Sequence, residues 1–189
     1  GDLMKQKSVL PEQPDLVQLG RPGWHERYYT TKFPELTDAA ERANVAYKFV
    51  EGMCWVMHYY YEGCASWKWF YPYHYAPFVG DMAPVIDPNS PFEFERGTPF
   101  LPFQQLMGVL PPRSSHALPS CLGTLMKNPA SPIADFYPLV FELDLNGKKF
   151  AWQAVVKLPF IDETRLLEAV RSCGQHLSVE EQQRNRHGT

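Results

Sequence analysis

The sequence has no excess of basic residues, a feature that most stand-alone nucleic-acid-binding domains show. Its 18 Lys and Arg residues are outnumbered by 21 Asp and Glu residues, so the formal net charge is −3. Because contacts to phosphates supply much of the affinity for nucleic acids, this balance excludes a chain that binds RNA or DNA through a broad basic surface. If the chain touches RNA, it does so with few residues, and most phosphate binding lies elsewhere.

The sequence also lacks the patterns of several other protein classes. No apolar run approaches the roughly 20 residues of a membrane span, and no signal peptide is visible. The four cysteines include no CxxC pair, which is typical of reduced intracellular thiols. Neither a G-x-S-x-G elbow nor a Gly-rich phosphate loop is present, so serine or cysteine hydrolase chemistry has no support. The chain opens with Gly1-Asp2-Leu3-Met4, which suggests a fragment or a processed chain.

Aromatic residues and prolines are, by contrast, abundant. The 189 residues, enough for one ordinary domain or slightly more, include 12 Phe, 10 Tyr, 5 Trp and 18 Pro. Proline is therefore about twice as frequent as its average usage of roughly 5%. Together these residues predict long ordered loops pinned by buried rings. They do not predict a disordered chain, because the aromatics supply the burial that disordered chains lack.

Several helices are predicted from apolar periodicity and capping residues. The clearest begins after Asp38, has apolar side chains at three- and four-residue steps from Ala39 to Tyr60, and ends at Gly63. These side chains form one apolar face over about six turns. Shorter helices are predicted at 24–33, twice within 100–127 between prolines, after Asp162, and after Ser178, where Glu181 completes a capping box.

A β-hairpin is predicted near the C-terminal end. Asn146-Gly147 lies between two apolar segments, 141–145 and 150–158, and Asn-Gly favours a two-residue type I′ hairpin turn. On the second strand Trp152 is expected to share one face with other apolar residues, and Asp144 on the first strand is expected to face solvent. The predicted fold class is therefore α+β, with several helices and a C-terminal β-hairpin.

The metal-ligating residue types do not occur in a pattern that favours a metal site. Cys54, His58, Cys64 and His74 are ligand types that zinc prefers, but Cys54 and His58 lie one helical turn apart. A packed cysteine and a helix-surface histidine are therefore favoured over zinc. Two-metal nucleases need several converging carboxylates, and the acids here form no D-x-D cluster. Structural roles are favoured for Asp81, Asp87, Glu93, Glu95, Asp135, Glu142, Asp144, Asp162 and Glu163.

Residues 64–100 have neither helical nor strand periodicity and predict an extended, ordered loop that is functional or packed on a partner surface. Within it, 66–77 reads Ser-Trp-Lys-Trp-Phe-Tyr-Pro-Tyr-His-Tyr-Ala-Pro. Nucleobases stack on aromatic faces for about 1–3 kcal/mol each, so this segment could line a channel for a single strand. On composition alone, rings that attach the loop to a larger body are favoured. Lys148, Lys149 and Lys157 on the hairpin could reach phosphates, although isolated lysines are more often just solvated.

Several longer motifs resemble the Xrn family of 5′→3′ exoribonucleases, in the family order and over residues 24–186. VEGMCW, CASWKW and NGKKFAWQ are similar to the nuclear branch of that family, whereas FQQLMGVLPPRSS is closer to the cytoplasmic branch. The nuclear branch is favoured. The matching segments are Val50–Tyr61, Ser66–Pro77, Thr98–Leu110, Asp135–Pro138, Leu143–Gln153, Pro159–Glu163 and Arg184–Arg186.

The resemblance implies a division of labour between two segments of one enzyme. Enzymes of this family remove nucleotides one at a time from the 5′-phosphate end of RNA, and their metal-binding acids and basic pocket belong to a first conserved segment. This chain resembles the second segment, which packs on an α/β nuclease core and narrows its site to single strands. The resemblance therefore implies no catalytic residue and no metal ligand here, with Mg²⁺ or Mn²⁺ bound by the N-terminal segment. RNA-stacking or pocket-lining roles are implied for Trp152, as the first choice, and for Trp67, Trp69, His74 and Tyr73.

The expected organisation is a linker or arm at 1–23, the second conserved segment at 24–181 and a polar tail at 182–189. Expected partners are RNA, the N-terminal nuclease segment and protein cofactors, with no membrane. The nucleus is the favoured location and the cytoplasm is the alternative. The chain alone is expected to be inactive. The alternative is a non-catalytic scaffold, derived from such an enzyme, that binds RNA or protein.

Overall fold

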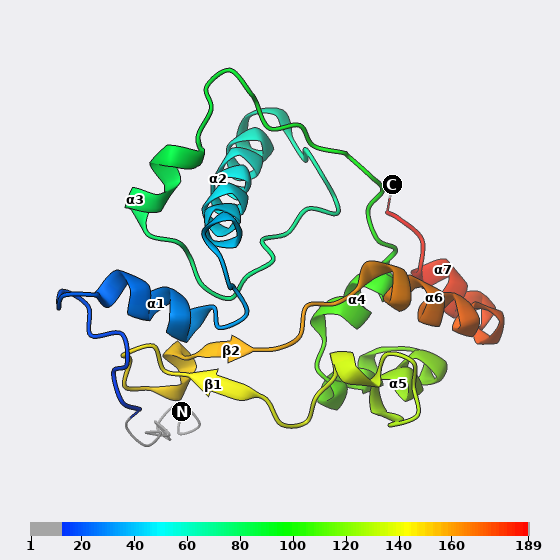
Figure 1. Cartoon of the computed structure of the whole chain (residues 1–189). Coiled ribbons are helices and arrows are strands. Elements are labelled where there is room, and N and C mark those ends of the chain that lie inside the picture. Colours follow the sequence, from blue (N-terminus) through cyan, green and yellow to red (C-terminus); the bar gives the residue numbers. More distant parts are fainter. Residues whose placement is uncertain (1–12, 189) are drawn as a thin grey trace, which may run out of the picture. The chain divides into compact units, whose positions relative to one another are not determined.

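The computed structural model describes residues 13–188, which separate into two compact units. Unit 1 contains the chain up to Gly97 and its return segment Leu143–Lys157. Unit 2 contains Thr98–Glu142 and the chain from Leu158 onward. Residues 1–12 of the expected arm and residue 189 of the expected tail lie outside the described residues, and the expected boundaries stay predictions. Helices and a small two-stranded sheet, traced in Figure 1, confirm the α+β class.

The long helix of unit 1, α2, spans Ala39–Glu62 and confirms the predicted start and end. The Asp38 carboxylate accepts a hydrogen bond from the Glu41 N–H (2.8 Å), and the Glu41 carboxylate accepts in return from the Asp38 N–H. This reciprocal cap satisfies two N–H groups that a helix start leaves without partners. At the other end Gly63 adopts φ +94°, which glycine tolerates and other residues rarely adopt.

The first half of α2 packs on a core of aromatic rings. Helix α1, Trp24–Lys32, supplies Tyr29 and is followed by Phe33, while the loop after α2 supplies Tyr75; all three pack with Val45 of α2. A short helix, α3 (Val79–Met82), and a 3₁₀ turn at Ala83–Val85 interrupt the otherwise irregular segment 64–100. The predicted extended loop is therefore confirmed except at this point.

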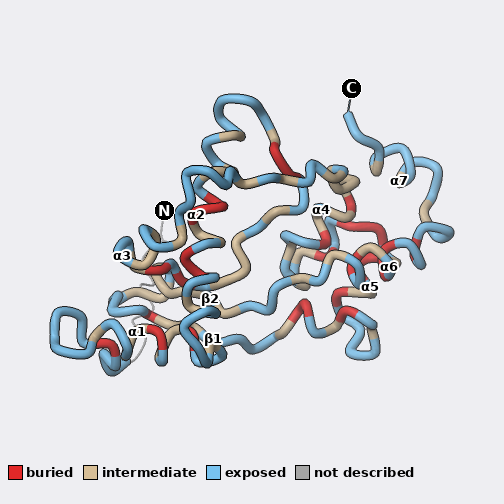
Figure 2. Tube along the Cα trace, turned by 45° about the horizontal axis from the view of Figure 1, so that its top comes forward, coloured by how far each residue is buried: buried red, intermediate tan, exposed pale blue. Residues whose placement is uncertain are grey.

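The second half of α2 is different, because its apolar side chains are largely exposed within the described structure. The buried residues of α2 lie around the middle of the helix, and its C-terminal turns are mostly exposed (Figure 2). Val45 and Ala46 are fully buried, but Met53, Met57 and Tyr60 are 53%, 55% and 78% exposed. The periodicity predicted the apolar face correctly, but only half of that face is covered.

The hairpin of unit 1 is shorter than predicted. Strands β1 (Glu142–Asp144) and β2 (Val155–Lys157) pair, but the intervening chain forms a 3₁₀ turn at Ala151–Gln153. Asn146 and Gly147 have φ of +48° and +76°, and the Lys148 N–H donates to the Leu145 carbonyl (2.8 Å). The type I′ turn is thus present, but the prediction that the strands pair directly beside it is wrong.

Unit 2 is built mainly from helices around an aliphatic core. Phe103, Met107, Leu122, Ile133 and Leu166 are among its fully buried side chains. The predicted short helices and caps are confirmed. The elements are α4 Pro102–Val109, a 3₁₀ turn Pro112–Ala117, α5 Ser120–Lys127, a 3₁₀ turn Ala134–Phe136, α6 Glu163–Cys173, a 3₁₀ turn Gly174–His176 and α7 Val179–Arg184. None of the helices described over 13–188 has the length and apolar character that a membrane crossing would need.

Candidate nucleic-acid interface

The aromatic segment 66–77 turns back along α2 as soon as that helix ends. Ser66 makes the turn, because its hydroxyl accepts hydrogen bonds from the N–H groups of Lys68 (3.3 Å) and Trp69 (3.2 Å). The Trp55 indole N–H of α2 donates to the Ser66 carbonyl at 3.0 Å. The chain is therefore guided onto α2 by polar contacts as well as by its rings.

Trp69, one of the five predicted site residues, holds the aromatic segment against α2. Its indole N–H donates to the Glu51 carboxylate (2.8 Å), which also accepts from Lys48 (2.8 Å). The indole lies over Gly52 so closely that a Cβ there would be 2.4 Å from the ring. A ring held from the edge and the face has little freedom to receive a nucleobase. The geometry favours a structural role for Trp69.

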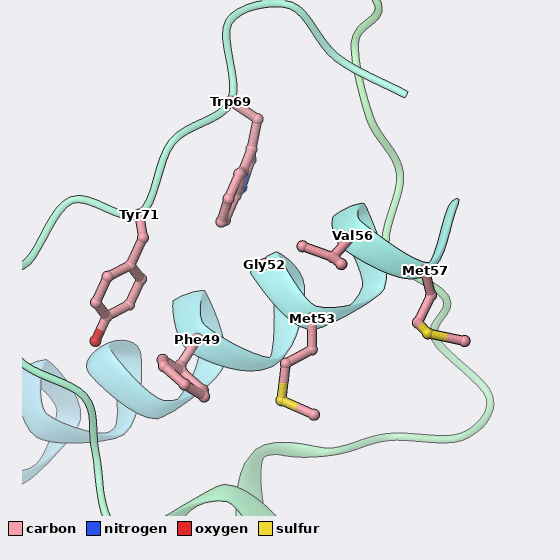
Figure 3. Close-up of a pocket in the computed structure, with 7 residues that line it drawn as sticks. All are labelled: Phe49, Gly52, Met53, Val56, Met57, Trp69 and Tyr71. Carbon is pink, nitrogen blue, oxygen red and sulfur yellow. The ribbon is translucent and has the colours of Figure 1, made fainter. Parts of the chain in front are cut away.

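Trp69 and Tyr71 form one wall of an apolar groove on α2, which Figure 3 shows from the side. The groove has a volume of about 450 Å³. Its floor consists of the exposed half of the α2 apolar face. The lining residues are Phe49, Gly52, Met53, Val56, Met57, Trp69 and Tyr71.

Every second residue from 71 to 75 is a tyrosine whose ring packs in the aromatic core of unit 1. Tyr71 donates from its hydroxyl to the Tyr75 carbonyl (2.7 Å), and burial raises the pKa of Tyr71. Tyr73 accepts a hydrogen bond from the Asn44 amide of α2 (3.0 Å) and packs edge-on against Phe33. These contacts favour a structural role for Tyr73.

Trp67 and His74 are the two exposed members of the predicted set on this segment. Trp67 is 47% exposed, and its backbone N–H donates to the Arg96 carbonyl at 2.9 Å. His74 is exposed and sits between the half-buried Tyr73 and the buried Tyr75. Both side chains are therefore accessible on a backbone that the neighbouring residues hold in place.

Trp152 is the most exposed of the three predicted tryptophans, with 76% of its surface accessible. It lies in the 3₁₀ turn between β1 and β2, so the prediction that it occupies the second strand is wrong. Its ring stacks on Phe150, with centroids 6.2 Å apart and planes within 8°. A nucleobase can extend this stack, because the exposed face of the Trp152 ring can receive another flat ring.

Asp144 links the hairpin to the rest of unit 1, and the sequence analysis missed this role. Its carboxylate accepts hydrogen bonds from Lys32 of α1, from the Tyr75 hydroxyl and from the Asn146 N–H (2.8 Å). The Asp144 side chain is only 15% exposed, so the expectation that it faces solvent is wrong. The Asp-x-Asn-Gly spelling could have suggested the contact within the turn. Nothing local could have suggested Lys32.

The four residues of zinc-ligand type do not form a metal site in the described part of the chain; they are Cys54, His58, Cys64 and His74. His58 instead contacts the Gly63 carbonyl through Nδ1 (3.2 Å) and Glu62 through Nε2 (3.2 Å), and the Cys64 thiol donates to the Ser66 carbonyl. Across residues 13–188, no three His, Cys, Asp or Glu side chains are grouped as a metal ion would need.

Three further candidate acids have structural partners. Asp81 accepts from the Tyr29 hydroxyl (2.6 Å) and contacts His25 (2.9 Å). Asp135 pairs with both terminal nitrogens of Arg165, which holds the pKa of this carboxyl below its ordinary value. Asp162 accepts from the Arg165 N–H (3.0 Å) and confirms the predicted cap of α6.

Residues 13–188 thus define an α+β segment that presents exposed aromatic rings from an otherwise well-bonded framework. The chain belongs to the Xrn1 helical domain family, whose model matches residues 2–189. It is 52% identical over 90% of its length to a 5′-3′ exoribonuclease 2 of Arabidopsis thaliana. Proteins of the same name from Saccharomyces cerevisiae and Gallus gallus are 51% and 49% identical over 96% and 90% of the chain. The chain spans 17–18% of the length of these relatives.

Proposed function

We propose that this chain is part of a 5′→3′ exoribonuclease that degrades 5′-monophosphorylated single-stranded RNA processively. Its role in that enzyme is to complete the active-site pocket and the RNA channel by base stacking and by excluding duplex. The single observation that carries this role is the Trp152 ring, which is 76% exposed and already stacked on Phe150. The similarity to proteins named 5′-3′ exoribonuclease 2 supports the reaction.

The hydrolysis itself belongs, in this proposal, to an N-terminal nuclease segment that binds Mg²⁺ or Mn²⁺. Among its carboxylates, Asp81, Asp135 and Asp144 do not fit such ions, because each contacts a basic side chain. A divalent ion would have to displace that side chain and then find further acids nearby. Magnesium would supply charge stabilisation at the scissile phosphate, on residues outside this chain.

Stacking serves a processive enzyme because it is indifferent to sequence. Every base has a flat face, so each new nucleotide can occupy the same ring after a step. A duplex cannot use an exposed ring in this way, because its bases are already stacked and paired. The formal charge of −3 agrees with a chain that holds bases while other residues hold phosphates. A nuclear location is proposed from the spelling of the motifs alone.

A non-catalytic scaffold is the second candidate, and the apolar groove on α2 favours it. An exposed groove of about 450 Å³ lined by Met, Phe and Trp side chains is the kind of surface that protein partners cover. The two candidates differ in one respect. The enzyme requires Trp152 for turnover, whereas a scaffold requires neither Trp152 nor a metal.

The test is degradation of 5′-monophosphorylated RNA in the presence of Mg²⁺, by the full-length protein and by this chain alone. The full-length protein is expected to be active and the chain alone inactive. Trp152→Ala is expected to lower kcat/KM by about 5- to 150-fold, the equivalent of one lost stacking contact of about 1–3 kcal/mol. Metal binding should be unchanged.

Two further variants control this experiment. Trp152→Phe keeps a flat ring and should retain most of the activity. Tyr61→Ala removes a ring that is 79% exposed on α2, and it should leave the rate unchanged. Activity of the chain alone would overturn the assignment of hydrolysis to another segment. An unchanged rate for Trp152→Ala would remove the stacking role.

A further inference from the structure

The position of the Trp152 ring is not fixed by burial of the ring itself. With 76% of its surface exposed, the side chain has few neighbours that could hold it in one place. A stacking group is effective only when its framework is held still, because small misplacements cost rate. The backbone of the loop between β1 and β2 must therefore be fixed by other groups.

Asp144 stands at the start of this loop and receives hydrogen bonds from three separate segments. Lys32 donates from α1, the Tyr75 hydroxyl donates from the aromatic segment, and the Asn146 N–H donates from the turn. The bond to the Asn146 N–H supports the turn that the Lys148-to-Leu145 hydrogen bond closes, and Asn146 has a φ of +48° there. One carboxylate thus sets the turn and attaches it to two other parts of unit 1.

The surroundings of Asp144 keep the carboxylate ionised and the arrangement specific. Burial by itself would raise the pKa of Asp144, but the hydrogen bonds from Lys32 and Tyr75 outweigh it and hold the pKa below its ordinary value. The Lys32 and Asp144 side chains are 9% and 15% exposed. Buried ion pairs contribute little net stability, and their best-supported benefit is to select one arrangement among several.

Tyr75 is held as firmly as Asp144. Its side chain is buried, and the amino groups of Lys32 and Lys157 are 5.1 and 5.9 Å from the centroid of its ring. Lys157 belongs to β2, the strand that follows the Trp152 turn. The two ends of the loop therefore meet the same tyrosine, one through Asp144 and the other through Lys157.

We propose that Asp144 is a positioning residue for Trp152: through Lys32, Tyr75 and Asn146 it fixes the loop that presents the stacking ring to the RNA. This inference rests on the proposed function. The competing explanation is that Asp144 only stabilises unit 1, in which case its loss would not act through Trp152.

A double-mutant cycle on the full-length protein separates the two explanations. Asp144→Asn keeps the shape of the side chain and removes its charge. In the wild-type background it is expected to lower kcat/KM on 5′-monophosphorylated single-stranded RNA by about tenfold, within the range for a displaced stacking contact. In the Trp152→Ala background the same substitution is expected to change kcat/KM by less than about twofold, because the group through which it acts is gone.

Milder and control variants keep the test decisive. Tyr75→Phe retains the ring, removes one donor to Asp144 and should give a smaller loss with the same dependence on Trp152; it carries the test if Asp144→Asn fails to fold. Glu26→Gln also removes a carboxylate that pairs with a basic residue of unit 1, Arg42, and should leave kcat/KM unchanged. Equal losses in both backgrounds, or no loss in either, would overturn the role of Asp144 alone. A Trp152→Ala variant with wild-type kcat/KM would instead overturn the stacking role and this inference with it.

Discussion

The cores of the two units are built from different side chains and held together by different interactions. In unit 2 the buried side chains are mainly aliphatic or thioether groups, such as Met107, Leu122 and Ile133. The Tyr137 hydroxyl donates to the Met107 carbonyl (2.8 Å), and burial raises the pKa of Tyr137 to about 12. Cohesion here is mostly non-directional, because apolar burial depends on area and not on orientation.

The interior of unit 1 consists largely of aromatic rings, and three of them donate a hydrogen bond from a hydroxyl or an indole N–H to a carboxylate. Tyr29 donates to Asp81, Trp69 donates to Glu51, and Tyr75 donates to Asp144. Such bonds are directional, so each fixes the orientation of a ring as well as its depth. Unit 1 therefore has a less uniform core than unit 2, but its directional hydrogen bonds fix the positions of its surface loops. That is the unit from which the candidate stacking ring projects.

The largest effect should follow truncation in the aliphatic core. Leu122→Ala removes a side chain that is 1% exposed and leaves a cavity in unit 2. We expect a loss of about 2–5 kcal/mol in the free energy of unfolding, measured by urea denaturation. Val179→Ala, at a position of the same unit that is 82% exposed, should change it by less than about 0.5 kcal/mol. Similar losses for both variants would contradict an apolar core in unit 2.

The next effect should come from crowding the docked ring of unit 1. In Gly52→Ala the new Cβ would lie 2.4 Å from the Trp69 ring, so the loop or the helix must shift. We expect a destabilisation of about 1–3 kcal/mol, as for other overpacked sites. Gly108→Ala is the matched control in helix α4 of unit 2, where a Cβ would meet nothing within 4 Å. There the substitution should stabilise by about 0.5–1 kcal/mol. Thermal unfolding measures the change in melting temperature of both variants. A change of the same sign in both would contradict the close packing of Trp69 on Gly52.

The sequence predicted the locally determined parts of this fold well. The boundaries of α2 follow from the Asp38 cap and from Gly63, and the φ values of Asn146 and Gly147 follow from the Asn-Gly pair. Each of these features depends on residues within a few positions of one another. Local steric and hydrogen-bonding preferences are strong enough to fix them without the rest of the chain.

The parts that could not be predicted depend on distant contacts. Strand pairing stops short of the Asn146-Gly147 turn, and Asp144 is held by Lys32, which lies 112 positions away in the sequence. Alternation of side chains along a strand cannot reveal such a partner. Periodicity likewise revealed the apolar face of α2 but not which half is covered. Among the five predicted site residues, chemistry could not separate the docked Trp69 from the exposed Trp152, because both are tryptophans in aromatic surroundings.

A smaller effect, and one that depends on pH, is expected at the acid that organises unit 1. Asp144→Asn should lower the free energy of unfolding at neutral pH by roughly 1–2 kcal/mol, the difference between hydrogen bonds to a charged and to a neutral acceptor. The folded-state pKa lies below the ordinary value of 3.8, so this stabilisation is present above about pH 4 and is lost as the pH falls through the lowered pKa.

The measurement is urea unfolding of both proteins from pH 7 down to pH 3, with the difference in unfolding free energy between them expected to narrow toward the acidic end. Glu95→Gln serves as the control, because Glu95 is 86% exposed and its amino partner on Lys68 is 4.0 Å away. Exposed pairs of this kind contribute little, so no gap is expected at any pH. A gap for Asp144→Asn that stays constant across the range would show that shape, and not charge, is what the site requires.

The smallest effect concerns RNA binding by the loop that carries Trp152. Lys148 and Lys149 are exposed on that loop, and each phosphate contact to a single strand contributes about 0.7 to the slope of log K against log salt concentration. Replacing both with Gln in the full-length protein should therefore reduce this slope by about 1.4, while the preference for single strands stays the same. Fluorescence anisotropy with labelled RNA between low and moderate salt measures the slope. Lys127→Gln, at an exposed lysine of α5 in unit 2, should leave it unchanged. Equal slopes for all variants would show that the loop contacts RNA through its ring alone. A reduction of about 0.7 by Lys127→Gln would show that α5 also contacts RNA.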